Sequence, residues 1–244
     1  MKTRRLRIPN EFYLAKLETV NEIGGMQDAD SFDLNLLRVL FACYIEFRYC
    51  WFSILLISKI LTGNKYNHLL KNSKKDTTLT FELIKKRIDK LMKIKIENNG
   101  ILASLIRIQV IDEKIRFVNE PLYIRECLNN AKIIEFECLK LENFHQSMAI
   151  INLKFFIIDS CLKEEGEITI LMKSIYRISG FEKARKKARA DYMNRRITYT
   201  ILKKRESELR NTMMKMVDQI LTHLVNYQHI DSYLIDCKKI LIDK

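Results

Sequence analysis

The sequence predicts a mainly α-helical protein with small β-ribbons, and three observations lead to this fold class. Only six Gly and two Pro interrupt 244 residues, which favours long helices. A hydrophobic content of 48% is ample for packed cores, in one large domain or two small ones. Apolar residues recur mainly at spacings of three and four, and the spacing changes to two only in short stretches.

Three helices are predicted in the first part of the chain. Ser31 or Asp33 can cap the first, whose inward side chains recur at helical spacing: Leu36, Leu37, Leu40, Phe41, Tyr44 and Phe47. The run 51–61 is apolar nearly all round and stops at 62–64, before a polar surface loop at 64–76. The inward side chains of the third helix are Phe81, Ile84, Ile88 and Leu91. Its opposite side carries a basic stripe formed by Lys86, Lys90 and Lys93.

The spacing then changes to that of a β-ribbon. Residues 94–97 alternate between apolar and polar, Asn98-Asn99-Gly100 supplies turn residues, and 101–110 is rich in Ile and Leu. Asp112-Glu113 makes a second turn, and a short helix is expected at 121–128, since proline is favoured at a first helical position. Three helices followed by a β-ribbon is the order of a winged-helix domain.

The second half repeats this order less completely. A helix is predicted at 153–162, a strand or helix lead-in at 167–169 and a short helix at 171–176. Ser179-Gly180 then turns the chain into a helix whose inward face is Phe181, Ala184, Ala188 and Tyr192. From Tyr199 on, apolar spacings of four, three, four and four favour a long terminal helix over a short coiled coil: Leu209, Met213, Met216, Ile220 and Leu224.

The expected organisation is tandem winged-helix domains with a long C-terminal helix. An N-terminal arm at 1–32 precedes the first domain at 33–130. A winged-helix-like second domain spans 140–216, and C-terminal helices occupy 217–244.

Positive charge is concentrated in one segment. Residues 181–216 hold twelve Lys or Arg against four Asp or Glu, which is a net +8 of the chain's +13. Residues 1–7 add four more positive charges, and the rest of the chain is close to neutral. A localised basic surface indicates a polyanionic partner, although a solvated helix face is the simpler reading.

Two segments resemble the Rep initiators of theta-replicating, iteron-bearing plasmids. The first runs from Thr80-Phe-Glu-Leu-Ile-Lys-Lys-Arg through the ribbon to Ile115-Arg-Phe-Val-Asn-Glu-Pro, and the second from Gly166-Glu-Ile-Thr to the basic helix at 181–196. The resemblance is one of order and polarity and covers about 50–220. It implies that two recognition helices bind repeated sites in a replication origin, that the protein forms dimers, and that it meets host replication proteins.

The residues themselves predict a helix-turn-helix protein that binds double-stranded DNA. The side chains expected to face the groove are Lys183, Lys186, Lys187 and Asn194, of which Asn194 can pair with adenine. The expected phosphate contacts are Arg185, Arg189, Arg195 and Arg196. An equally good reading of Arg195 packs its stem on the domain. The stripe of Lys86, Lys90 and Lys93 is a second candidate DNA surface.

Enzymatic function is not expected. The chain has no phosphate-binding glycine loop, and its four histidines stand apart without metal-ligand spacing, so neither a cofactor nor a metal is predicted. A nuclease site is not expected from the acidic and basic residues that lie near one another in sequence, Asp112, Glu135, Glu137 and Lys140, because Glu137 and Lys140 lack the spacing of a strand-borne Glu-x-Lys. Six scattered cysteines and a polar start indicate reduced thiols in the cytoplasm. The uncharged stretch 49–58 is about half the roughly twenty residues that a membrane span needs, so no membrane contact is expected.

Two other functions fit the same charge. An all-helical interaction protein, in phage defence or in a structural assembly, would use the basic helix to bind an acidic protein, and it would lack the ribbon at 94–118. Binding of single strands or RNA is the third, but apart from the inward-facing Phe181, Tyr192 and Tyr199 are the only aromatic residues in the basic segment, which is a thin stacking platform.

Overall fold

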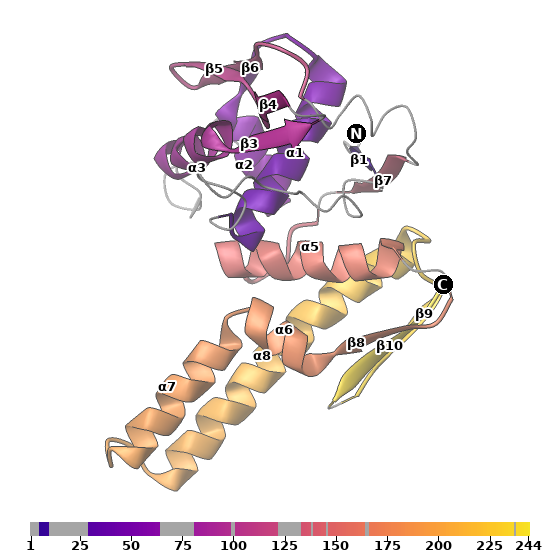
Figure 1. Ribbon diagram of the computed structural model, residues 1–244. Coiled ribbons are helices and arrows are strands. Elements are labelled where there is room, and N and C mark those ends of the chain that lie inside the picture. Colours follow the sequence, from indigo (N-terminus) through magenta and orange to yellow (C-terminus); the bar gives the residue numbers. More distant parts are fainter. Residues whose placement is uncertain are drawn as a thin grey trace. The chain divides into compact units, whose positions relative to one another are not determined.

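The computed structural model describes residues 5–9, 29–63, 81–98, 101–121, 133–137, 139–144, 146–163, 166–236 and 238–244. The chain divides into two compact units, Met1–Lys140 and Leu141–Lys244, whose elements are drawn in Figure 1. Helices predominate, and the strands form small antiparallel sheets, so the predicted fold class is confirmed at this level. Among the described residues, no helix combines the length and apolar character needed to cross a membrane.

Helix α1 (Ser31–Phe47) forms the core of the first unit. Asp30 caps it instead of the predicted Ser31 or Asp33, because its carboxylate accepts hydrogen bonds from the backbone amides of Phe32 and Asp33 at 2.9 and 3.0 Å. The Asp33 carboxylate accepts in turn from the Asp30 amide at 3.0 Å, which completes a capping box. The predicted inward residues of this helix are buried, and only Phe47 is half-buried.

The predicted apolar helix at 51–61 contains a short strand and a helix. Strand β2 (Phe52–Ser53) comes first, and helix α2 (Ile54–Thr62) follows with the Ser53 hydroxyl accepting from the Leu55 amide at 3.1 Å. Gly63 ends α2 at a φ of 76°, which confirms the predicted stop. A Cβ at this position would overlap the backbone of Leu139, so the position requires glycine.

Helix α3 (Phe81–Lys93) buries three of the residues that were predicted to face inward. Ile84, Ile88 and Leu91 have no exposed surface. The loop expected at 64–76 and the helix expected at 121–128 fall outside the described residues, apart from Pro121.

Two hairpins follow α3 in the chain, as the change in spacing predicts. The first joins β3 (Lys95–Asn98) to β4 (Ile101–Ser104), with Asn98 opposite Ile101. The second joins β5 (Ile108–Ile111) to β6 (Lys114–Phe117) through the predicted turn, where Asp112 has a φ of 51°. Strand β2 pairs with β6, so the sheet has the order β2-β6-β5.

The N-terminal arm contributes a strand to the first unit. Strand β1 (Arg5–Pro9) pairs antiparallel with β7 (Ile133–Glu137), and Arg7 lies opposite Glu135. The sequence pattern does not predict this pairing, because the two strands are more than a hundred residues apart and each is too short to be distinctive alone. The expected separate arm at 1–32 is therefore wrong for residues 5–9 and for the start of α1.

The second unit begins with the predicted elements. Helix α5 (Met148–Lys163) starts five residues before the expected position, strand β8 (Ile168–Leu171) replaces the open choice at 167–169, and α6 (Met172–Ile178) is the short helix. Gly180 turns the chain at a φ of 75° into α7 (Phe181–Met193). The long helix α8 (Tyr199–Asn226) follows, with Met213, Met216, Ile220 and Leu224 buried as expected.

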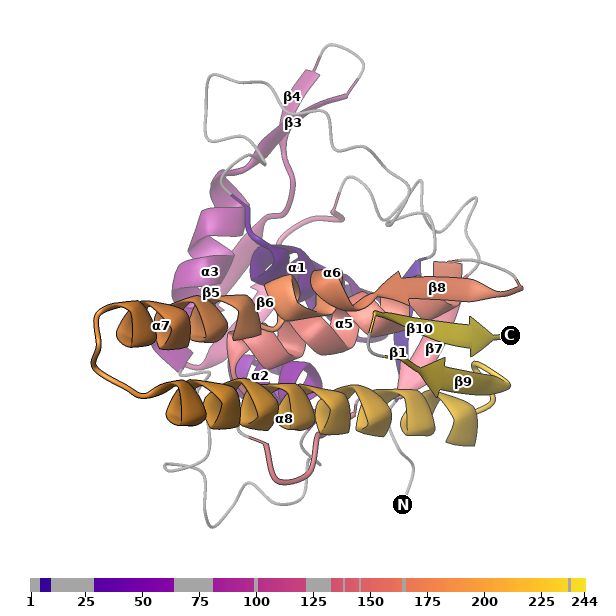
Figure 2. The same ribbon diagram turned by 90° about the horizontal axis from the view of Figure 1, so that it is seen from below.

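The expected C-terminal helices at 217–244 are wrong beyond Asn226. Residues there form β9 (Ser232–Ile235) and β10 (Lys239–Asp243), and β10 lies between β9 and β8 in the sheet. Ile240 and Ile242 are fully buried on one face of this sheet, shown in Figure 2. The alternating pattern spans only a few residues, and its partner β8 lies about seventy residues earlier in the chain. The strands in both units also rule out an all-helical protein.

Candidate nucleic-acid interface

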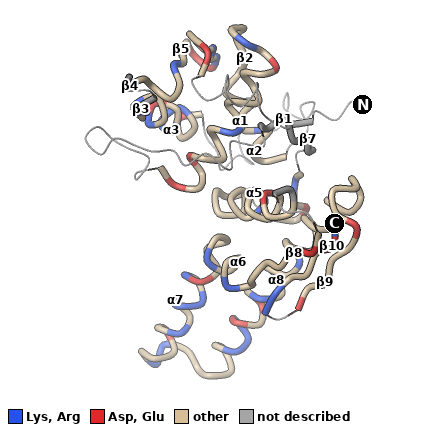
Figure 3. Tube along the Cα trace, turned by 45° about the vertical axis from the view of Figure 1, so that its right-hand side comes forward, with Lys and Arg blue, Asp and Glu red and all other residues tan. Residues whose placement is uncertain are grey.

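Residues 181–216 form a helical hairpin, here called the basic hairpin. Helices α7 and α8 lie side by side and are joined by a short turn at 194–198, as Figures 1 and 2 show. Lys and Arg recur along α7 and along the adjoining part of α8 in Figure 3. The net charge of +8 that the sequence concentrates in one segment is thus carried by two neighbouring helices. The site predicted from the sequence does not include the basic residues of α8, of which Lys203, Lys204 and Arg205 form a continuous run.

Helix α7 is exposed around most of its circumference. Ala188 is its only buried residue, and Phe181 and Ala184 are half-buried, in agreement with the narrow inward face predicted for them. Tyr192 departs from that prediction because 38% of its surface is exposed. It stands near the end of α7, where its ring lies 6.0 Å from the ring of Tyr199 in α8.

Two ion pairs join the helices of the hairpin. Arg189 Nε lies 2.8 Å from Glu206 Oε1, and Arg205 Nη1 lies 3.4 Å from Asp191 Oδ2. Leu202 of α8 is buried, at 6% exposure. These contacts join α7 to α8, so the two helices present one continuous surface.

Three of the predicted groove residues are lysines on the exposed side of α7. Lys183, Lys186 and Lys187 are all exposed. Lys186 Nζ lies 3.1 Å from Glu182 Oε1, and this contact lowers the pKa of the Glu182 carboxyl. Lys183 and Lys187 make no ion pair with any residue that the structure describes. Their charge is therefore not neutralised within the hairpin.

The fourth predicted groove residue, Asn194, lies beyond the end of α7. It is the C-cap residue, and its backbone N–H donates to the backbone carbonyl of Ala190 at 2.9 Å. Eleven residues separate it from Lys183, which corresponds to about 16 Å along a helix axis at about 1.5 Å per residue. Asn194 consequently lies at the opposite end of the helix from Lys183, whereas Lys186 and Lys187 lie near the middle of α7.

The arginines predicted to contact phosphates differ in their surroundings. Arg189 makes the ion pair with Glu206 described above, and 57% of its side chain stays exposed. Arg185 is half-buried with its guanidinium 5.6 Å from the centroid of the Tyr176 ring. Arg196 is 73% exposed and lies 3.8 Å from Asp191, and Arg195 is exposed at a φ of 57°. The exposure of Arg195 is compatible with a phosphate contact.

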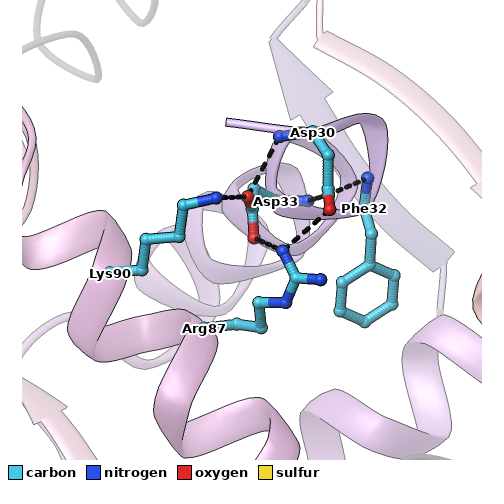
Figure 4. A network of polar contacts seen from close by, with 5 residues as sticks. All are labelled: Asp30, Phe32, Asp33, Arg87 and Lys90. Carbon is cyan, nitrogen blue, oxygen red and sulfur yellow. Dashed lines mark hydrogen bonds and ion pairs between the residues drawn. The ribbon is translucent and has the colours of Figure 1, made fainter. Parts of the chain in front are cut away.

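The predicted lysine stripe of the first unit divides into two groups. Lys86 and Lys93 are exposed. Lys90 instead donates to the buried carboxylate of Asp33 at 2.7 Å, beside Arg87, whose Nη1 donates to Asp30 and Asp33 at 2.8 and 2.9 Å (Figure 4). Lys90 thus takes part in a contact that holds α3 against α1.

Comparisons with known proteins identify no relative. No family model, no curated protein and no solved structure matches the chain. Within the described ranges there is also no group of three or more His, Cys, Asp or Glu placed to hold a metal ion. The candidate interface is therefore defined by its geometry and charge alone.

Proposed function

We propose that the protein binds double-stranded DNA in a sequence-specific manner and acts as a plasmid-type replication initiator. The observation that carries the DNA-binding part is the exposure of α7, whose lysines at 183, 186 and 187 face solvent while Ala188 alone is buried. A helix with this much free surface and unneutralised charge suits a phosphate-lined groove.

The order of elements supports a winged-helix interpretation of both units. In each, a helix, a strand and two helices are followed later by two strands, and the first strand pairs with the last: β2-β6-β5 and β8-β10-β9. The β3–β4 hairpin is inserted in the first unit and α8 in the second. In this interpretation α3 and α7 are equivalent third helices, and α6, the turn at Gly180 and α7 form a helix-turn-helix.

The dimensions of α7 support entry into a major groove. Thirteen residues extend about 20 Å, and a single helix of about 10–12 Å diameter fits a groove about 12 Å wide. Helix α8 would remain outside, so the face that enters is the one away from Ala188. Ala190 is exposed on α7, and its small side chain allows close approach to base edges.

The initiator role rests on the resemblance of the two segments to plasmid Rep proteins. It predicts dimers, a cytoplasmic location and contacts with host replication proteins. It further predicts two recognition helices on one chain and a site that spans about two turns of DNA, since successive major grooves are about 34 Å apart.

The DNA-binding proposal is tested by the salt dependence of affinity. Replacing Lys183 and Lys187 by Ala should flatten the slope of log affinity against log salt by about 1.8, because each neutralised phosphate contributes about 0.9. The matched control replaces Lys238 and Lys239, which are also exposed lysines of the second unit. A binding surface on α7 would be contradicted if both double variants flatten the slope equally, or if neither changes it.

Specificity is measured with sites selected from a random DNA pool. We expect a selected site to bind at least about 10³-fold more tightly than random DNA, the low end for specific DNA-binding proteins. If random DNA competes equally well, the initiator role is wrong. Binding to an acidic protein that weakens as salt is added, with no affinity for DNA, would support the interaction-protein alternative.

A further inference from the structure

The closed end of the basic hairpin exposes a cluster of large apolar and aromatic side chains. Their exposed fractions are large for such residues: Tyr192 38%, Met193 77%, Tyr199 57% and Ile201 43%. The end lies away from α6 and the sheet in both Figures 1 and 2. Exposed apolar patches that are rimmed by polar residues mark binding surfaces, so this end of the hairpin is a candidate binding surface.

Two tyrosines that are seven residues apart in the sequence meet at this end. The ring centroids of Tyr192, from α7, and Tyr199, from α8, are 6.0 Å apart, and the ring planes are inclined at 59°. Lys203 Nζ lies 5.4 Å from the centroid of the Tyr199 ring. The turn at 194–198 thus converts two isolated aromatic residues into one aromatic surface with a cation beside it.

The surface is hollowed on two sides of Tyr192. One open hollow of about 360 Å³ includes Tyr192, Tyr199 and Lys203 in its lining, and a second of about 440 Å³ includes Tyr192, Arg195 and Arg196. The only acidic residue in either lining is Glu206, which forms the ion pair with Arg189. Both hollows therefore combine apolar walls with positive charge.

This combination of chemistry selects a ligand with flat apolar faces and negative charge. A nucleobase joined to phosphates has both, and stacking on aromatic rings with nearby cations is how sequence-independent single-strand binding works. In an intact duplex the faces of the bases are covered by their neighbours. We propose that Tyr192 and Tyr199 form a stacking site for unpaired bases of a single nucleic-acid strand, and that Arg195, Arg196 and Lys203 bind the flanking phosphates.

The proposal extends the proposed function, since both place nucleic acid on the basic hairpin. It differs from it in the strand that is bound and in the residues that contact the bases, although Arg195 and Arg196 are expected phosphate contacts in both. Duplex binding depends on Lys183 and Lys187, in the first seven residues of α7, whereas strand binding depends on the tyrosines at the closed end of the hairpin. One of the two can fail without the other.

The direct test uses the full-length protein and a fluorescein-labelled twenty-nucleotide oligothymidylate. Its affinity, measured by fluorescence anisotropy, is compared with that of an oligonucleotide of equal length and charge in which abasic sites replace every base. We expect the abasic strand to bind the unaltered protein about 5- to 150-fold more weakly, the range that corresponds to about 1–3 kcal/mol per stacked base. Equal affinity for the two strands would overturn the proposal, whatever the behaviour of any variant.

Variants assign the effect to the two rings. Tyr192→Leu and Tyr199→Leu should each weaken oligothymidylate binding and reduce the difference between normal and abasic strands, whereas Tyr192→Phe and Tyr199→Phe should bind within about twofold of the unaltered protein. Tyr227→Leu is the matched control, because Tyr227 is 43% exposed and lies just past the far end of α8. Loss of strand binding in Tyr227→Leu to the same degree would overturn the assignment to the hairpin end.

The two proposals are separated by measuring duplex affinity for the same proteins. If Lys183 and Lys187 can be replaced without effect on duplex binding while the tyrosine variants lose the single strand, the proposed function fails and the stacking site stands. If the tyrosine variants keep the single strand while the lysine variants lose the duplex, the stacking site fails alone.

Discussion

Lys90 Nζ lies 2.7 Å from Oδ2 of Asp33, a carboxylate that has no exposed surface. The same carboxylate accepts from Arg87 at 2.9 Å and closes the capping box at the start of α1 (Figure 4). One aspartate therefore caps the start of α1 and also binds α3 to it. The contact also gives Lys90 a structural role that its place in a basic stripe did not indicate.

We expect Asp33→Asn to lower the free energy of unfolding of the first unit by about 2 kcal/mol. Removing one partner of a buried pair costs about 3–5 kcal/mol, and the cost is smaller here because Arg87 and Lys90 remain 19% and 34% exposed. Lys90→Ala should cost about 1 kcal/mol, and the matched variant Lys93→Ala less than about 0.5, because Lys93 is exposed. Urea unfolding followed by the fluorescence of Trp51, the single tryptophan, measures all three. Equal effects at Lys90 and Lys93 would contradict the contact.

The stability of the first unit should depend on pH below about 4. Burial raises the pKa of Asp30, but hydrogen bonds from the Asp33 amide and from Arg87 outweigh it and hold that pKa below the usual 3.8. A carboxyl with a depressed folded pKa stabilises the protein above its unfolded pKa and loses this effect as pH falls through the folded value. The loss should therefore begin near pH 4 and grow below it. Urea midpoints between pH 6 and 3 should fall less for Asp30→Asn than for the unaltered protein. Parallel curves would show that Asp30 is not a contributor.

Substitutions at the turn glycines should form a graded series. Gly180→Ala should cost about 1 kcal/mol, because φ is 75° while the added Cβ would meet only Ala149 Cβ at 3.8 Å. Gly180→Asn should cost less, since asparagine tolerates this conformation. Gly63→Ala should cost most, because its Cβ would also overlap the backbone of Leu139. Thermal unfolding by circular dichroism ranks the three. A stabilised Gly180→Ala variant would mean that the turn does not hold a positive φ.

Local patterns predicted most of the helices. Ile84, Ile88 and Leu91 recur at helical spacing and are buried, and the stops at Gly63 and Gly180 fall where the backbone adopts positive φ. The hairpin around Asn98 was also predictable, because its two strands are neighbours in the chain. These features depend on interactions over a few residues, which a sequence displays directly.

Pairings between distant segments were not predictable in the same way. Strand β10 pairs with β8, and β1 pairs with β7, across about seventy and more than a hundred residues. A strand of four or five residues carries too little pattern to specify its partner, and the partner is chosen by which apolar faces remain uncovered once the helices pack.

The candidate interface divides along the same line. The sequence by itself determined that positive charge gathers in residues 181–216 and that a turn at Gly180 precedes it. Only the tertiary structure decided which charges have an acidic partner, since Arg189 pairs with Glu206 and Lys90 with Asp33. It also placed Asn194 beyond the end of α7. It also decided that Tyr192 and Tyr199 face one another. Charge is a property of each residue alone, whereas neutralisation and ring contact require two residues that only the folded chain brings together.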